Sequence, residues 1–229
     1  MPTFLDLARK VGSESGTVAG SQITTVENTN DRIGKIVRWT NDAYRQIQNA
    51  NRDWGWLRDV LLDGTIVAGK AQYDAPSLGI TRFREWECTG DDREDRFHLL
   101  DPSTGQASRL RFMDYRAYLS LLGTSLGGDR PHSFTISPRG AIILHPRPTR
   151  AFLFRAPYRL APQELVSNAD VPDMPAHHHD VIVETALVLL ATHDEAAPTL
   201  ALYQLRQLRG FSQLEREQLP VIRVAEGFC

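Results

Sequence analysis

The spacing of apolar residues changes twice along the chain, and this change constrains the fold more than any other feature. Between residues 31 and 51 apolar residues recur at steps of three and four, the period of an amphipathic helix. Between residues 57 and 112 they form short runs separated by turn-forming pairs, which is typical of strands. The helical period returns after residue 176. Because helices and strands occupy separate stretches, the pattern predicts an α+β fold: a bundle of N- and C-terminal helices with an inserted antiparallel β-rich region.

The first 56 residues are predicted to form the N-terminal helical part of the bundle. A short helix covers residues 3–11, and a loop rich in Gly, Ser and Thr follows it. Asn28, Thr29 and Asn30 supply side-chain oxygens that can cap a longer second helix. Large aromatic side chains after that helix are expected to fix its end against the core. The expected anchors of the helical core are Ile33, Val37, Tyr44, Trp54, Trp56 and Leu187.

Residues 57–162 are predicted to form the β-rich insertion. Its first apolar run contains Asp63-Gly64, a turn-forming pair that divides the run into two strands. A short helix is predicted at residues 113–122. Three strands then form a meander punctuated by prolines, at residues 133–137, 141–145 and 152–160.

Residues 163–220 are predicted to complete the bundle with two helices. The helix that begins near Ala176 is apolar around most of its circumference, so it is expected to be central. Pro198 suits the first turn of the last helix, and Gly210 should weaken that helix by ~1 kcal/mol relative to Ala. The packing stripe expected on the last helix consists of Leu202, Leu205, Leu208 and Phe211. Residues 221–229 form a tail too short to build its own core.

The charge balance limits the classes of partner. The chain has 26 basic and 28 acidic residues and a net charge of −2, so a strong positive patch that grips nucleic acid is not expected. Its longest apolar run is too short to cross a bilayer, and its start lacks the apolar core of an export signal. The two cysteines suit a reducing cytoplasm, in which a disulfide between them is possible but not required.

The polar clusters do not match known catalytic or ligand-binding patterns. His177, His178 and His179 suggest a metal, but three adjacent residues on a helix point about 100° apart and cannot converge on one ion. His193-Asp194-Glu195 is not accompanied by a nucleophile at a recognisable spacing, and the acidic segment 91–95 lacks the ligand spacing of a calcium loop. The sequence therefore predicts no catalytic residue, no metal and no cofactor.

Four basic residues follow the long N-terminal helix: Arg32, Lys35, Arg38 and Arg45. A DNA-recognition helix would need a short partner helix and a tight turn just before it. A long loop precedes this helix instead. A solvated face or a subunit interface is therefore the preferred interpretation.

Several segments, in this order, resemble the head-to-tail adaptor (neck or connector) proteins of tailed bacteriophages. The opening helix is IGKIVRWTNDAYRQIQ at residues 33–48, followed by the tryptophan-containing turn WGWL. The proline-punctuated strands are GDRPHSF, AIILHPRP and FLFRAPY. The core helix after them begins within DMPAHHHDVIVETAL at residues 173–187. The resemblance spans most of residues 33–214.

This resemblance implies a structural protein of the virion neck, made in the cytoplasm of the bacterial host, and not an enzyme. Family members form a homo-oligomeric ring, usually a dodecamer, beneath the portal. The ring extends the channel through which DNA is ejected and gives the tail a platform. The implied partners are other copies of the chain, the portal protein and a tail or stopper protein, with DNA passing without sequence-specific binding and no membrane. The candidate portal-docking tail carries Val221, Ile222, Val224 and Phe228, enough apolar surface to order on binding.

Three alternatives remain open at this level. Another virion ring component, such as a stopper or tail-completion protein, would form a ring but dock on a different partner. A metal-dependent enzyme would use the histidines at residues 177–179 or His193. A small regulatory DNA-binding protein would form a dimer with salt-sensitive affinity for duplex DNA.

Overall fold

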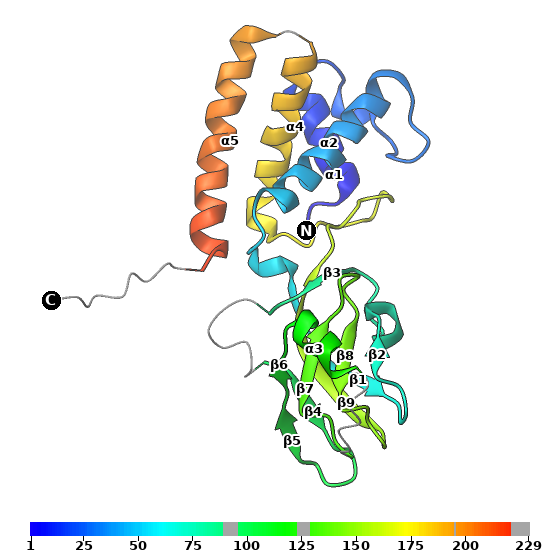
Figure 1. The fold of residues 1–229 in the computed structure, drawn as a ribbon. Helices are drawn as coiled ribbons and strands as arrows, with labels where there is room; N and C mark the ends of the chain where they lie inside the picture. Colours follow the sequence, from blue (N-terminus) through cyan, green and yellow to red (C-terminus); the bar gives the residue numbers. More distant parts are fainter. Residues whose placement is uncertain (89–95, 123–128, 195, 221–229) are drawn as a thin grey trace, which may run out of the picture. The chain divides into compact units, whose positions relative to one another are not determined.

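The computed structural model describes residues 1–88, 96–122, 129–194 and 196–220. The chain divides into two compact units (Figure 1). One unit comprises Met1–Leu57 together with Pro162–Cys229, and the other comprises Arg58–Ala161. Helices build the first unit and two mostly antiparallel sheets build the second, which confirms the predicted α+β class.

Helix α1 (Phe4–Glu14) opens the helical unit. Its start is a capping box: the Thr3 hydroxyl accepts from the Asp6 amide, and the Asp6 carboxylate accepts from the Thr3 amide at 3.0 Å. Phe4, Leu7 and Val11 are buried on one face. The helix continues three residues past its predicted end, and the short 3₁₀ turn η1 (Gly20–Gln22) interrupts the predicted loop.

Helix α2 (Asp31–Ala50) begins differently from the prediction. Its N-cap residue, Asn30, makes no side-chain hydrogen bond to the helix, so the expected side-chain cap from this residue is wrong. Asn28 and Asp31 instead adopt left-handed backbone conformations with φ of 51° and 52°. Asn and Asp tolerate this region better than most residues. A Cβ on Gly34 would lie 2.7 Å from the Thr29 carbonyl oxygen, so only glycine fits this close approach.

Polar residues at one-turn intervals on α2 hold the segment that re-enters the helical unit after residue 161. Gln48 accepts from the backbone N–H of Gln163 at 2.7 Å and donates to its carbonyl at 2.9 Å. Asn41 makes the same two-point contact with Leu165, at 3.2 Å and 2.9 Å. The Tyr44 hydroxyl donates to the Gln163 side chain and accepts from the Asp173 amide. These bonds satisfy backbone groups of a segment without regular structure, as burial requires.

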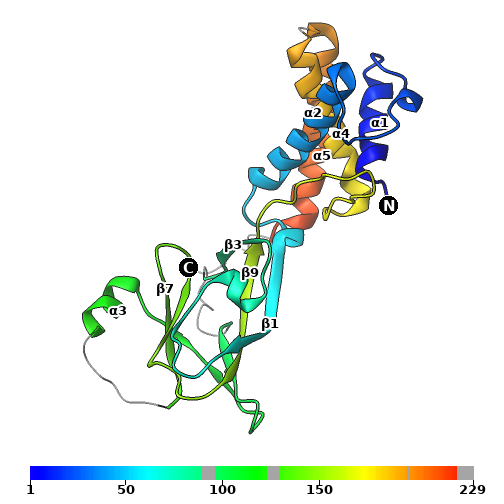
Figure 2. The same ribbon diagram turned by 90° about the vertical axis from the view of Figure 1, so that its right-hand side faces the viewer.

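The C-terminal helices complete the helical unit. After the 3₁₀ turn η5 (Ala176–His178), α4 (His179–His193) contacts α1, α2 and α5 (Ala197–Gln218), and it is therefore central, as its apolar circumference predicts (Figure 2). Proline occupies the first turn of α5, as expected. The short turn η2 (Gly55–Leu57) closes the N-terminal part of this unit.

The packing face of α5 differs from the prediction. Leu202, Leu205 and Leu208 are exposed, with exposed fractions of 48%, 49% and 65%, and Phe211 is half-buried. Buried positions are Tyr203 and Leu214 instead. Gly210 also belongs to the packing face: a Cβ there would lie 2.8 Å from Cγ2 of Val181 on α4. The apolar stripe at three-residue spacing therefore faces outward within this unit.

The β unit has two sheets. The first places the long strand β9 (Phe152–Leu160) between β1 (Arg58–Ile66) and two shorter partners, β3 (Phe83–Trp86) and β4 (His98–Leu100), with β5 (Ala107–Arg109) paired to β4. The second has the order β2 (Gln72–Tyr73), β8 (Ile142–His145), β7 (Ser133–Ile136), β6 (Arg111–Phe112). All pairs are antiparallel except β6 with β7. The turn η3 (Ala75–Leu78) and the helix α3 (Tyr115–Leu121) lie in the connections.

Two strand predictions need correction. Asp63 and Gly64 lie within one strand, β1, whose register shifts between Leu61 and Gly64, so the pair forms an irregularity and not a turn. The predicted three-strand meander is divided: β7 pairs with β8 in one sheet, whereas β9 pairs with β1, β3 and β4 in the other. The reason is that long-range pairing leaves no local signal in the sequence.

The core of the β unit is rich in aromatic side chains. Phe97 stacks on Phe134 with ring centroids 4.3 Å apart, and Trp86 meets Phe154 edge-to-face at 6.0 Å. The buried cluster around them includes residues of both sheets, such as Phe154 of β9 and Phe134 of β7. Such pairs contribute ~0.5–1.5 kcal/mol each beyond their buried area.

Buried charges in the β unit are paired. Arg159, 3% exposed, lies 3.3 Å from Glu85 and 3.9 Å from Glu87, and Arg96 approaches Glu87 at 3.3 Å. The carboxylate of Asp101 lies 2.7 Å from Arg150, and bonds from Ser103 hold the pKa of Asp101 below its ordinary value. Pairing offsets the cost of removing these charges from water.

Candidate functional site

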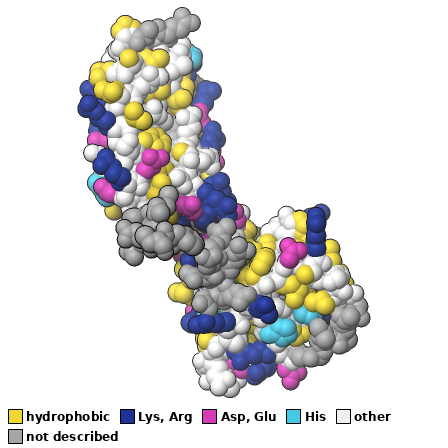
Figure 3. Space-filling view, turned by 60° about the vertical axis from the view of Figure 1, so that its left-hand side comes forward, with side chains coloured by type: hydrophobic (Ala, Val, Ile, Leu, Met, Phe, Trp, Pro, Cys, Tyr) yellow, Lys and Arg dark blue, Asp and Glu magenta, His cyan; other side chains and the backbone are white. Residues whose placement is uncertain are grey.

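An exposed stripe of apolar side chains follows α5 in the helical unit. It consists of Leu202, Leu205 and Leu208, each about half exposed or more. In space-filling view, hydrophobic side chains on this unit alternate with Lys, Arg and acidic side chains (Figure 3). Exposed apolar side chains surrounded by polar ones are typical of protein–protein contact sites. We call these three residues the α5 stripe.

Apolar side chains are also exposed in the β unit. Val60 and Leu62, 51% and 59% exposed, lie on β1, at the edge of the first sheet, and Val67 follows the strand. Leu119 and Leu122 are exposed in and just after α3. The β unit therefore offers further apolar surface for contacts with other chains.

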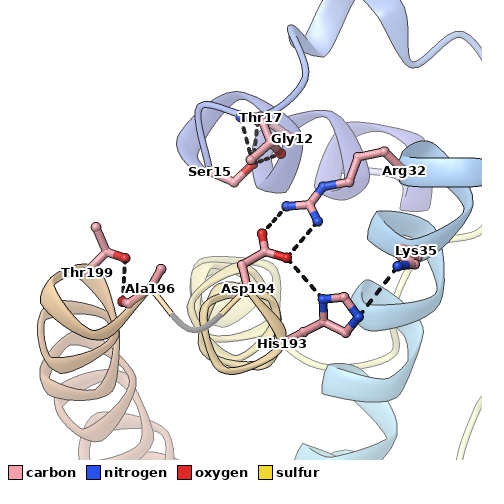
Figure 4. A network of polar contacts seen from close by, with 9 residues as sticks. All are labelled: Gly12, Ser15, Thr17, Arg32, Lys35, His193, Asp194, Ala196 and Thr199. Atoms are coloured by element: carbon pink, nitrogen blue, oxygen red, sulfur yellow. Dashed lines mark hydrogen bonds and ion pairs between the residues drawn. The ribbon is translucent and has the colours of Figure 1, made fainter.

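A charged network joins the start of α2 to the end of α4 (Figure 4). The two terminal nitrogens of the Arg32 guanidinium donate to the two carboxylate oxygens of Asp194, and Nη1 lies 2.9 Å from Oδ1. His193 Nδ1 lies 3.0 Å from Asp194 Oδ1, and Lys35 Nζ lies 3.5 Å from His193 Nε2. Because a lysine ammonium can only donate, Nε2 of His193 accepts and Nδ1 carries the proton given to Asp194.

Electrostatics in this network stabilise the ionised carboxylate. Hydrogen bonds from Arg32 and then His193 hold the pKa of Asp194 far below its ordinary value, and the same pair raises the pKa of Arg32. Trp39 packs beside the network, with its ring centroid 5.0 Å from that of His193. The acid and base groups noted at this helix end therefore form a tie between helices, and Glu195 lies outside the described residues.

The basic residues of α2 have separate surroundings. Arg32 and Lys35 contribute to the network above, and Arg45 pairs with Asp42 on the same helix. Arg38 is exposed. Three of the four side chains therefore make polar contacts within the helical unit, and two of these, Arg32 and Lys35, link α2 to the end of α4.

The three consecutive histidine side chains do not meet at one point, as their spacing predicts. Two of them, however, contact the same carboxylate. His177 Nε2 and His178 Nε2 each lie 2.9 Å from the same oxygen, Oε2 of Glu217. His179 is buried and lies 2.8 Å from the Met174 carbonyl through its Nε2, and burial lowers the pKa of this imidazole. Glu217 lies on α5, about 40 residues later in the chain, so the spacing of residues around the histidines could not predict this contact.

The expected anchors of the helical core differ in burial. Tyr44, Trp54 and Leu187 have exposed fractions of 0%. Ile33, Val37 and Trp56 are half-buried, and the fully buried apolar residues of α2 are Ile36, Ala43, Tyr44 and Ile47. Trp54 and Trp56 stack with centroids 4.7 Å apart, and Trp54 Nε1 donates to the Ile47 carbonyl at 2.7 Å, which fixes the chain at the end of α2.

Two other predicted features lie outside the described residues. These are the acidic segment 91–95 and the tail with Val221, Ile222, Val224 and Phe228. Among the helices that the structure describes, none is long and apolar enough to span a membrane.

Comparison with known proteins identifies the family. A search of curated proteins finds no match to the chain. The family model described as SU10 adaptor protein matches residues 2–224, which cover both units and nearly the whole chain. This match agrees with the bacteriophage adaptor resemblance of the opening helix, the proline-marked strands and the following core helix. The chain therefore belongs to the SU10 adaptor protein family.

Proposed function

We propose that this chain is the subunit of a ring that joins the phage portal to the tail and extends the DNA channel. The observation that carries the proposal is the adaptor family match over residues 2–224. An adaptor acts through contacts with other virion proteins, and a ring of about twelve copies in the virion neck would provide them. The chain would be made in the host cytoplasm and assemble there on the filled head.

A closed ring requires two different surfaces on each subunit, because its contacts are heterologous. We assign one of them to the α5 stripe. Its leucines are exposed although the helix is amphipathic. Burying them against a second copy would stabilise the contact by ~25 cal/mol for each Å² of apolar surface removed from water. The helices would then form the ring wall, and the β unit, residues 58–161, would supply contacts to the tail or stopper protein.

The C-terminal tail is the proposed portal hook. The tail begins three residues after the end of α5 at Gln218 and contains the apolar residues Val221, Ile222, Val224 and Phe228. A short apolar segment of this kind can order on a partner's surface and gain affinity from its anchors. The net charge of −2 suits a channel through which DNA passes without tight phosphate contacts.

Electron microscopy of the chain, alone and mixed with the portal protein of the same phage, tests this function. The expected result is a ring with rotational symmetry seated on the portal, whose class averages give the copy number. A monomer in the absence of portal agrees with assembly on a template. A monodisperse monomer that never joins a portal at micromolar concentrations would overturn the proposal, and a ring that seats only on another neck protein would indicate a stopper.

A further inference from the structure

Three side chains from two separate elements meet at one point of the helical unit. His177 and His178 belong to η5, which leads into α4, and Glu217 lies in the last turn of α5. One ligand atom from each residue, an imidazole nitrogen or a carboxylate oxygen, lies within 4.8 Å of the other two. His178 is 5% exposed, whereas His177 and Glu217 are exposed at 64% and 53%.

The hydrogen bonding of this cluster is unusual. Both Nε2 nitrogens lie 2.9 Å from a single carboxylate oxygen, and the imidazole rings have centroids 4.2 Å apart. Without a cation, both imidazoles must carry their proton on Nε2 and donate it to the same atom. When both nitrogens are deprotonated, the same arrangement presents two imidazole lone pairs and one carboxylate oxygen to a common point.

The ligand set favours zinc over magnesium or calcium. Imidazole nitrogen is a preferred ligand of Zn²⁺, whereas Mg²⁺ and Ca²⁺ take oxygen ligands. Ligands about 2.0–2.2 Å from a tetrahedral zinc lie about 3.3 Å from one another. The distances from the two Nε2 nitrogens to Glu217 Oε2 are 2.9 Å, and the ligand atoms of the three residues lie within 4.8 Å of one another. Since the ligand–ligand distance around zinc falls between these two values, small rotations of the exposed His177 and Glu217 side chains are enough to reach tetrahedral geometry.

The surroundings give an ion access to the site. A groove of about 460 Å³ is lined by His177 and His178 and by charged side chains of both signs. In the same groove, Lys10 pairs with Asp180 of α4 at 2.8 Å. Burial and the neighbouring Asp180 raise the pKa of Glu184 in the same groove. The groove connects the buried His178 with solvent, and water can complete the coordination of an ion.

We propose that His177, His178 and Glu217 bind one Zn²⁺, which ties the start of α4 to the end of α5. Two imidazoles and one carboxylate leave at least one position open, for water or for a ligand from another chain. The ion would fix the last turn of α5, from which residues 221–229 continue. The site rests on geometry alone and does not depend on ring formation.

Zinc titration of the full chain, purified without a histidine tag or metal column, tests the site. Calorimetry with ZnCl₂ should give one ion per chain, and zinc should raise Tm. Glu217→Gln should reduce zinc affinity at least about tenfold, because it removes the only anionic ligand. Glu215→Gln, an exposed carboxylate two residues earlier on α5, should leave affinity unchanged.

Two further measurements make the outcome decisive. His177→Asn, at an exposed position, should also lower affinity without the folding risk of changing the buried His178. Co²⁺ bound to the wild-type chain should show visible d–d bands typical of low coordination number, and Glu217→Gln should lose them. Absence of zinc binding would overturn the proposal. An affinity that none of these substitutions changes would show adventitious binding only, and it would overturn the proposal as well.

Discussion

At the scale of single residues, close packing of α5 on α4 favours glycine at position 210, although helix propensity favours alanine there. Glycine costs a helix ~1 kcal/mol relative to alanine, so Gly210→Ala alone would be expected to stabilise α5. A Cβ at this position, however, would lie 2.8 Å from Val181 Cγ2 and 2.9 Å from Glu184 Oε2. Val181 is buried and cannot easily move away. Overpacking typically costs ~1–3 kcal/mol, which exceeds the gain in helix propensity.

We therefore expect Gly210→Ala to lower Tm by several degrees, against the direction that helix propensity predicts. Thermal unfolding followed by circular dichroism checks this. In a Val181→Ala background the obstructing methyl group is absent, so the same substitution should cost less, and the double-mutant cycle should show coupling. An equal effect of Gly210→Ala in both backgrounds would show that the close approach of α4 and α5 is not the cause.

Asp194 gives a pH-dependent prediction. Its folded-state pKa is lowered by Arg32 and His193, so its contribution to stability is present above the unfolded-state pKa near 3.8 and is lost as pH falls toward the lower folded-state value. Asp194→Asn should lower the free energy of unfolding at pH 7 by about 0.5–1 kcal/mol, since the pair is partly exposed and screened. The difference from wild type should shrink below pH 4.

Urea unfolding between pH 2.5 and pH 7 measures this difference directly. Glu215→Gln on the exposed face of α5 serves as the control and should give a curve close to that of wild type. A constant difference between Asp194→Asn and wild type across the whole pH range would contradict the assigned ionisation of Asp194.

At the scale of secondary-structure elements, the sequence predicts what depends on local periodicity. The bounds of β9 agree with residues 152–160, and α2, α4 and the proline-started α5 lie where their apolar spacing indicates. Strand partners do not follow from local spacing: β9 leaves the expected meander and pairs with β1, about 90 residues earlier in the chain. The same limit applies to sites, because Glu217 reaches His177 and His178 only through the packing of α5 on α4.

The α5 stripe shows a second limit, since periodicity reveals an apolar face but not its partner. Leu202, Leu205 and Leu208 are spaced as a packing face and yet lie exposed in the helical unit. If the stripe is a ring contact, Leu205→Glu with Leu208→Glu should abolish ring assembly on the portal. Because the side chains are exposed, the free energy of unfolding should change by only about 0.5 kcal/mol or less.

Negative-stain electron microscopy and light scattering with portal measure this assembly. Gln204→Glu adds a single charge to an exposed position of the same helix and should leave assembly intact. Rings of normal size from the double variant would exclude the stripe as a subunit contact, while the family assignment would stand.

At the scale of the whole molecule, the proposed function assigns self-association and portal docking to different parts of the chain. Removing residues 221–229 takes away Val221, Ile222, Val224 and Phe228 but none of the core residues in either unit. The truncated chain should therefore keep its Tm within about 1–2 °C, because only core, cap or network losses shift stability strongly. It should no longer dock on the portal, as measured by co-sedimentation.

A full-length chain with those four apolar residues changed to serine keeps the tail's length and is the matched comparison. It should behave like the truncated chain, because docking by a short extended segment depends on a few apolar anchors that fill pockets of the partner. Docking of the serine variant but not of the truncated chain would assign the contact to the tail's backbone, as in strand addition. Undiminished docking of both chains would remove the tail from the portal contact and direct attention to the exposed apolar side chains of the β unit, including Val60 and Leu62.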